Sequence, residues 1–165
     1  MNKKQIIDFL NKKEIWFELT EHEAVFSMDE IDNIEMPYPE SEAKNLFLTD
    51  GKKKSYYLIS VKGNKRINLK EFKRQNNACH LSFASENDLD EILQLKPGSV
   101  TPLGILNDNN CKVKVYLDKE FLELPRLIGV HPNDNTATVW LKIDDLINII
   151  KEHGNKFELV DIPVS

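Results

Sequence analysis

Apolar positions recur along the chain with two different periods, and the period predicts the type of element. Apolar residues spaced three and four apart predict amphipathic helices, whereas short runs rich in β-branched and aromatic residues predict strands. The predicted helices cover residues 2–13, 69–76, 88–95 and 143–152. The predicted strands cover residues 16–19, 45–49, 55–61, 79–84, 103–106, 112–117, 127–130, 136–141 and 157–160.

Turn and capping residues predict how these elements are connected. Asp50-Gly51 between two strand-like runs favours a hairpin, and residues 107–110 favour another between 103–106 and 112–117. Ser27 with Glu30 forms a capping-box pattern that predicts a short acidic helix ending near Ile34. Ser85 is the expected N-cap of the helix over 88–95. Helices mixed with hairpin-linked strands predict an α+β fold, a single domain over residues 1–165 with a central mixed, largely antiparallel sheet flanked by helices.

Composition narrows the class of protein. The chain has 165 residues, of which 41% are hydrophobic and 30% charged, which is typical of one globular domain. No apolar run approaches the ~20 residues needed to cross a bilayer, and no signal peptide is evident at the N-terminus. Cys79 and Cys111 are the only cysteines, without a metal-ligand spacing. We therefore expect no disulfide framework, no zinc site, no membrane association and a cytoplasmic location.

The net charge of −5 conceals two segments of opposite sign. Residues 21–42 hold eight acidic residues and no lysine or arginine, whereas residues 52–74 hold nine basic residues and one acid, Glu71. A charge run of this kind is either a solvated face or a local positive patch for a phosphate backbone. The nine basic residues are Lys52, Lys53, Lys54, Lys62, Lys65, Arg66, Lys70, Lys73 and Arg74.

Three short stretches are candidates for chemistry. The sequence has none of the motifs of dinucleotide sites, P-loops, zinc proteases or serine hydrolases, which removes most support for those classes. Lys44-Asn45 places an amine and an amide next to each other at the start of a strand. Gly98 to Pro102 is either a connecting loop or a loop whose backbone N–H groups bind an oxyanion. His131 stands between a glycine-containing strand and a proline, which restricts its backbone.

An ordered set of segments carries a resemblance to a known family. These segments are AKNLFL (43–48), LSFAS (81–85), KPGSVTPLGILND (96–108), VYLDKEFL (115–122) and GVHPNDNTATV (129–139). Together they resemble the prolyl-tRNA editing domain family, also called the YbaK/aminoacyl-tRNA deacylase family, and are most similar to its free-standing alanyl-tRNA(Pro) deacylase branch. The resemblance covers nearly the whole chain.

The resemblance implies a trans-editing hydrolase that uses water, without metal or cofactor, to cleave the ester of a mischarged tRNA(Pro), most simply alanyl-tRNA(Pro). It implies that Lys44 holds a phosphate, Asn45 orients the ribose or the ester, and His131 positions the amino group or the water. Backbone N–H groups of the loop would bind the oxyanion, and the ribose hydroxyl would assist. The loop residues are Gly98, Ser99, Val100, Thr101 and Pro102; the expected pocket wall is Val25, Phe26, Gly129, Thr136 and Thr138.

The expected partners are the acceptor end of aminoacyl-tRNA(Pro), held by the nine basic residues, and prolyl-tRNA synthetase. Two alternatives stay open. One is a cysteinyl-tRNA(Pro) deacylase, and the other is a non-catalytic tRNA- or nucleotide-binding module associated with prolyl-tRNA synthetase.

Overall fold

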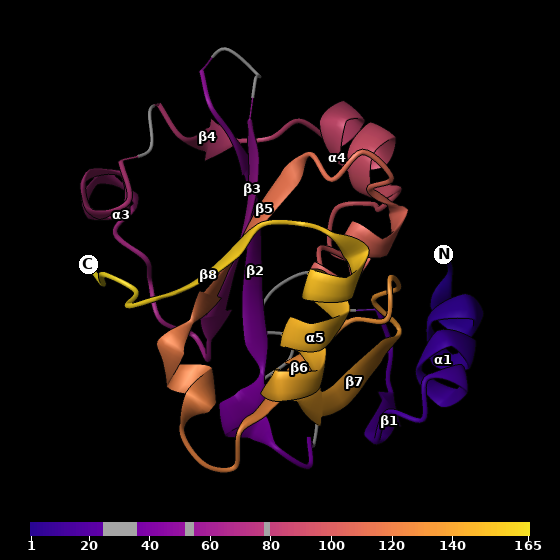
Figure 1. The fold of residues 1–165 in the computed structure, drawn as a ribbon. Coiled ribbons are helices and arrows are strands. Elements are labelled where there is room, and N and C mark those ends of the chain that lie inside the picture. The colour runs from indigo at the N-terminus through magenta and orange to yellow at the C-terminus, as the bar shows by residue number, and fades with distance from the viewer. Residues whose placement is uncertain (25–35, 52–54, 78–79) are drawn as a thin grey trace.

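Two β-sheets and the helices around them make up the fold in a computed structural model that describes residues 1–24, 36–51, 55–77 and 80–165 (Figure 1). In chain order the elements are α1 (Lys3–Lys12), β1 (Phe17–Glu21), the 3-10 helix η1 (Pro39–Ser41), β2 (Ala43–Thr49), β3 (Tyr56–Lys62), α3 (Leu69–Gln75), β4 (Ser82–Phe83), α4 (Glu86–Leu93), the 3-10 helices η2 (Pro102–Asn107) and η3 (Lys119–Leu122) with β5 (Val113–Asp118) between them, β6 (Leu127–Val130), β7 (Ala137–Lys142), α5 (Ile143–His153) and β8 (Phe157–Val160).

The strands form a five-stranded sheet in the order β4-β2-β3-β5-β8 and a three-stranded sheet in the order β1-β7-β6. Within the larger sheet β2 is antiparallel to β3 and β4, whereas β5 is parallel to β3 and β8. The smaller sheet is antiparallel throughout. The expected α+β fold with mixed, largely antiparallel strands is confirmed, but two sheets replace the one central sheet. A parallel bridge between Glu42 and Gly129 connects the start of β2 to β6.

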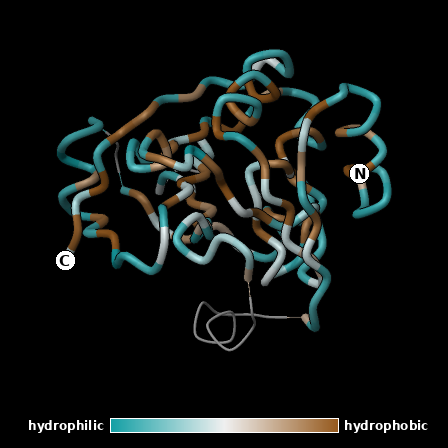
Figure 2. Tube along the Cα trace, turned by 90° about the horizontal axis from the view of Figure 1, so that it is seen from below, coloured by the Kyte–Doolittle hydropathy of each residue, from teal (hydrophilic) through white to brown (hydrophobic). Residues whose placement is uncertain are grey.

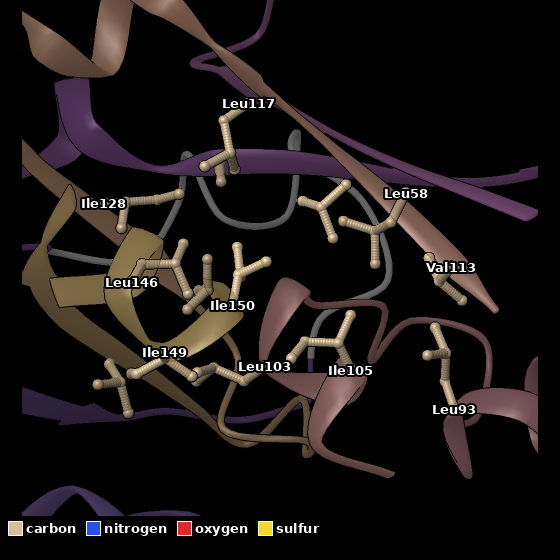
Figure 3. Close-up of a cluster of buried hydrophobic side chains, with 14 of the residues drawn as sticks. Leu58, Leu93, Leu103, Ile105, Val113, Leu117, Ile128, Leu146, Ile149 and Ile150 are labelled. Carbon is tan, nitrogen blue, oxygen red and sulfur yellow. The ribbon is translucent and has the colours of Figure 1, made fainter. Parts of the chain in front are cut away.

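The main hydrophobic core lies between the two sheets. Leu58 and Leu117 reach it from the larger sheet, Ile128 from the smaller sheet, and Leu103 and Ile150 from η2 and α5 (Figure 3). The hydrophobic stretches accordingly lie mainly in the segments that pass through the middle of the molecule (Figure 2). This burial is the main stabilising contribution, about 25 cal/mol for each Å² of apolar surface.

A second, smaller cluster covers the opposite face of the larger sheet. It contains Leu48, Val61 and Tyr116 from the sheet and Phe72 from α3, whose ring meets the Tyr116 ring edge-on at 5.0 Å. We call the side of the larger sheet that faces the main core its inner face, and the side that carries this second cluster its outer face. Both faces of the larger sheet are therefore packed.

Local capping chemistry sets several helix ends, and the expected N-cap Ser85 is one of the residues involved. The Ser85 hydroxyl accepts a hydrogen bond from the backbone N–H of Asp88 at 3.0 Å, so α4 begins at Glu86. The Asn68 side chain likewise accepts from the N–H of Glu71 at the start of α3. At the other end of α5, Gly154 takes a left-handed conformation with φ of 106°, which a residue without Cβ adopts without strain.

One predicted strand is wrong in the structure, and another is shorter than predicted. Residues 103–106 form the 3-10 helix η2, in which Leu103 and Ile105 are fully buried, so no hairpin connects them to β5. Pro102 occupies the first helical position and the Thr101 hydroxyl accepts from the Leu103 N–H, which together favour a helical turn. The strand predicted over 79–84 shortens to Ser82–Phe83. The helix predicted from Ser27 lies outside the described residues.

Candidate functional site

His131 directly follows β6 and is largely buried. Its Nδ1 lies 2.9 Å from the carbonyl oxygen of Ala137, and because a carbonyl only accepts, Nδ1 carries a proton and donates. Burial lowers the pKa of His131, and the nearby His22 lowers it further, against the opposing effects of the Ala137 carbonyl and Asp134. The ring is therefore neutral near pH 7, and its Nε2 has a lone pair that can accept a hydrogen bond.

His22, which sequence reasoning did not single out, forms a pair with His131. The two ring centroids lie 6.1 Å apart in an edge-on arrangement. Nδ1 of His22 donates to the carbonyl oxygen of Glu23 at 2.7 Å, and Nε2 lies 3.0 Å from the Thr138 hydroxyl oxygen. The backbone N–H of His22 donates to the carbonyl of Thr136. The sequence offered no signal for this role, because the strand predicted over 16–19 ends before Thr20, and only the observed β1 ends directly before His22.

Lys44 lies beside the strand that leads to His131. The Glu42–Gly129 bridge is parallel, and Lys44 follows Glu42 by the same two positions as His131 follows Gly129. Lys44 is half-buried, and its side chain makes no hydrogen bond or ion pair with the part of the chain that the structure describes. A partly desolvated ammonium group without a partner is suited to binding an anionic group such as a phosphate.

Asn45 projects from the other face of β2. The fully buried Ser60 hydroxyl donates to Asn45 Oδ1 at 2.6 Å. Successive strand residues point to opposite faces, so Asn45 shares the inner face with Phe47, whereas Lys44 shares the outer face with Leu46. The expected arrangement of amine and amide side by side is thus replaced by one group on each face. The Asn45 NH2 group has no acceptor among the described residues.

The loop from Gly98 to Pro102 holds unpaired backbone donors. The Ser99 N–H already donates to the Lys96 carbonyl at 3.0 Å. The N–H groups of Gly98, Val100 and Thr101 have no acceptor within residues 1–24, 36–51, 55–77 and 80–165. Thr101 is fully buried, and buried N–H groups are nearly always paired in proteins. The loop can therefore donate hydrogen bonds to a ligand, but not through Ser99.

The same loop lies next to the loop that follows His131. Ser99 and Lys96 on one side and residues 133–135 on the other line a common cavity of about 600 Å³. The structure thus brings the Gly98–Pro102 loop and the His131 segment together, as it does β2 and β6. Neither Lys44 nor Asn45 lines this cavity.

The described residues of the expected pocket wall lie in different surroundings. Gly129 lies against Trp140, whose ring would be 2.3 Å from a Cβ at this position. Thr138 is buried beside His22. Thr136 instead closes a turn, because its N–H and its hydroxyl both donate to Asp134 Oδ1, at 2.8 and 2.5 Å, and these bonds lower the pKa of Asp134. Val25 and Phe26 lie outside the described residues.

The basic segment is partly neutralised within the chain. Lys65 Nζ lies 2.5 Å from Asp118 Oδ2 and 3.0 Å from Glu120 Oε1. Burial lowers the pKa of Lys65, but its hydrogen bonds to these carboxylates outweigh this effect, and the pKa is raised. Arg74 pairs with Glu71, and Lys62 Nζ donates to the Glu120 carbonyl. Arg66, Lys70 and Lys73 have no such partner among the described residues, and Lys52, Lys53 and Lys54 lie outside them.

The described residues show neither a metal site nor a membrane-spanning helix. These residues contain no group of three or more histidine, cysteine, aspartate or glutamate side chains arranged to hold a metal ion. None of the helices they form is long and apolar enough to cross a membrane.

Comparison with known proteins gives one consistent result. The model of the aminoacyl-tRNA editing domain family matches residues 22–149. The chain is 37% identical over 160 residues to the prolyl-tRNA editing protein ProX of Acetoanaerobium sticklandii, covering 97% of each protein. It is 35% identical to the prolyl-tRNA synthetase associated domain-containing protein 1 of Bos taurus, covering 84% of this chain and 82% of that protein. The solved structure of a proposed trans-editing enzyme for prolyl-tRNA synthetase has the same fold, with a TM-score of 0.70 and 18% identity, over 100% of this chain and 99% of that one.

Proposed function

Because this chain belongs to the aminoacyl-tRNA editing domain family, we propose that it is an aminoacyl-tRNA deacylase that clears mischarged tRNA(Pro), with alanyl-tRNA(Pro) as the preferred substrate. The observation that carries the proposal is the similarity to ProX over 97% of both chains, together with the placement of Lys44 beside the His131 strand. The reaction is the attack of water on the ester carbonyl. Its products are the free amino acid and the tRNA with its terminal ribose hydroxyl restored.

Oxyanion stabilisation is the contribution of the Gly98–Pro102 loop. An aminoacyl ester is already activated, so a strong nucleophile is not required. The unpaired N–H groups of Val100 and Thr101 would donate to the carbonyl oxygen as it gains negative charge. One such donor contributes roughly 3 kcal/mol in other hydrolases. The Ser99 N–H is excluded from this role because the turn already uses it.

His131 and Lys44 would hold the two ends of the substrate. The neutral His131 ring offers Nε2 to the substrate ammonium group or to the attacking water, while its Nδ1–H stays bonded to Ala137. Lys44 would bind the phosphate of the terminal adenosine as a point charge. Asn45 projects to the inner face, where its free NH2 group would reach the ribose or the ester only around the end of the strand.

Selection of alanine would depend on size. A single methylene changes binding in an apolar pocket by only ~1–3 kcal/mol, so a synthetase that mistakes alanine for proline needs a second, smaller site. Cysteine is close to alanine in size, and a cysteinyl-tRNA(Pro) deacylase is the alternative substrate assignment. Relatives named for association with prolyl-tRNA synthetase favour that enzyme as a partner of this chain.

The deciding experiment measures deacylation of alanyl-, cysteinyl- and prolyl-tRNA(Pro) by the wild type and by Lys44→Ala and Lys44→Arg. We expect rapid hydrolysis of the alanyl ester, no hydrolysis of the prolyl ester, and at least a 100-fold loss in Lys44→Ala. Lys156→Ala, which removes an exposed lysine outside the proposed site, is the matched control. Binding of tRNA without hydrolysis of any ester would refute the enzyme and support a binding module. Full activity of Lys44→Ala would remove Lys44 from the site.

A further inference from the structure

A polar cavity adjoins the proposed site and has no role in the mechanism above. It measures about 600 Å³, within the range of roughly 300–1,000 Å³ that small-molecule sites occupy. Its wall comes from the start of α1, from the end of α4 with the loop that follows, and from the loop after His131. The polar side chains that carry the argument are those of Asn2, Gln5, Gln94, Lys96, Ser99 and Asn133.

Amide groups with unused hydrogen-bonding capacity dominate this wall. Asn2 Oδ1 and Gln5 Oε1 each accept from the other residue's backbone N–H, which leaves both NH2 groups free to donate. The side-chain amide of Gln94 has no hydrogen-bond partner among the described residues. Asn133 Nδ2 donates to the Met1 carbonyl at 2.9 Å, but Asn133 Oδ1 is buried and accepts no hydrogen bond from any described residue. A buried acceptor of this kind destabilises the protein unless a ligand or solvent pairs it.

Donors and acceptors in this combination fit the edge of a nucleobase. Amide side chains pair with base edges because each presents a donor and an acceptor side by side. Leu95 and Pro97 add apolar surface for the face of a ring, and the exposed Lys96 is a cation at the margin for a phosphate. Asp134, the acidic group in the wall, already accepts two hydrogen bonds from Thr136, which lower its pKa and satisfy one oxygen.

The position of the cavity indicates which nucleotide it would take. Ser99 in its wall is the residue immediately before the proposed oxyanion donors, and Asn133 is two residues after His131. The cavity is thus contiguous with the place where the aminoacylated terminal ribose would lie. We propose that the cavity binds the unpaired nucleotide next to the terminal adenosine, a cytidine in every tRNA, through its base edge and its phosphate. This proposal depends on the proposed deacylase activity.

The test combines changes in the enzyme with changes in the substrate. Lys96→Ala removes the cation, and Gln94→Asn shortens the amide by one methylene while tolerating the left-handed backbone at this position, where φ is 54°. The substrates are alanyl-tRNA(Pro) with the normal penultimate cytidine and the same tRNA with an abasic nucleotide there. Lys112→Ala, which removes an exposed lysine outside this cavity, is the control variant.

We expect Gln94→Asn and Lys96→Ala each to raise KM five- to ten-fold on the normal substrate with kcat within two-fold of wild type. The abasic substrate should raise the wild-type KM to a similar degree. It should raise the KM of Gln94→Asn only slightly further, because the base and the Gln94 amide form one contact that either change removes. Independent effects, or a wild-type KM unchanged by the abasic nucleotide, would overturn the cavity assignment while leaving the deacylase intact. Absence of any wild-type deacylation would instead reject the proposed function itself. Thermal melting confirms that the variants are folded.

Discussion

Replacing Gly129 by alanine is the sharpest test of how the site is built. An added Cβ would lie 2.3, 2.5 and 2.9 Å from three carbon atoms of the Trp140 ring, all in its six-membered part. Real Cβ atoms do not approach other heavy atoms this closely, so either the ring or the strand must move. Trp140 is fully buried, and Tyr38 lies edge-on against it at 5.6 Å, which leaves the ring little room.

Overpacking in a well-filled core typically costs 1–3 kcal/mol, and the severity of this contact places Gly129→Ala at about 3 kcal/mol. For a chain of this size each kcal/mol lowers the melting temperature by roughly 2–4 °C, so we expect a drop of about 6–12 °C. Gly104→Ala is the matched control. The added Cβ would lie 2.7 Å from the flexible end of the Leu95 side chain, and a rotation of that side chain can relieve the contact. Gly104→Ala should therefore lose less stability than Gly129→Ala.

Urea denaturation of Gly129→Ala, Trp140→Phe and the double variant measures the contact directly. Trp140→Phe alone is destabilising because it loses the hydrogen bond from the indole N–H to the Thr20 hydroxyl. If ring and Cβ collide, the double variant should be at least 1 kcal/mol more stable than the sum of the single losses predicts. Additive losses, or a Gly129→Ala variant as stable as the wild type, would refute the close approach of Trp140 to β6.

Four further predictions concern charge and buried polar groups. Burial lowers the pKa of His131 below its ordinary value of 6.5, so the unfolded state binds a proton at a higher pH than the folded state does. The free energy of unfolding should therefore be highest above pH 6.5 and decrease as the pH falls below it. Urea denaturation of His131→Asn at several pH values should show less of this decrease. His22→Gln should raise the pKa of His131 in an NMR titration, because it removes the electrostatic effect by which His22 lowers that pKa; an unchanged pKa would contradict the pairing. Asp108→Ala should cost about 3 kcal/mol in urea denaturation, because the N–H groups of Lys112 and Val113 and the Asn155 amide lose their acceptor, whereas Asp108→Asn should cost less. In salt titrations of tRNA binding, Arg66→Ala should flatten the slope of log K against log salt concentration by about 0.7–0.9. Lys65→Ala should change this slope less, since Asp118 and Glu120 already neutralise the lysine. Equal slopes for the wild type and Arg66→Ala would argue against the basic segment as a phosphate contact.

Local chemistry explains which parts of the fold the sequence allowed us to predict. Ser85 could be predicted as the cap of α4 because a hydroxyl three residues before a backbone N–H stabilises the start of a helix through a purely local contact. The strand predicted from Leu103 to Leu106 is wrong because a short, continuous apolar run has the same sequence pattern in a buried strand and in a buried helix. The proline at its start was the signal that favoured the helix.

The site itself depends on contacts that are distant in sequence. No local pattern predicts the bridge between Glu42 and Gly129 that brings Lys44 to the strand of His131. The placement of Lys44 and Asn45 on opposite faces, in contrast, follows from strand alternation once β2 is known to begin at Ala43 instead of Asn45. His22 gave no usable signal, because its role comes from its contact with Thr138 across the β1–β7 pair.

In the proposed mechanism, the Glu42–Gly129 bridge also makes the alignment of two strands a condition for catalysis. A slip of β2 by one residue against β6 would turn Lys44 to the inner face, and a molecule with this register would lack the proposed phosphate contact. Folding intermediates in which the two sheets have formed but not yet joined would have the same defect. Deacylase activity per molecule would then report the fraction of chains that have reached the correct register, a quantity that circular dichroism does not detect.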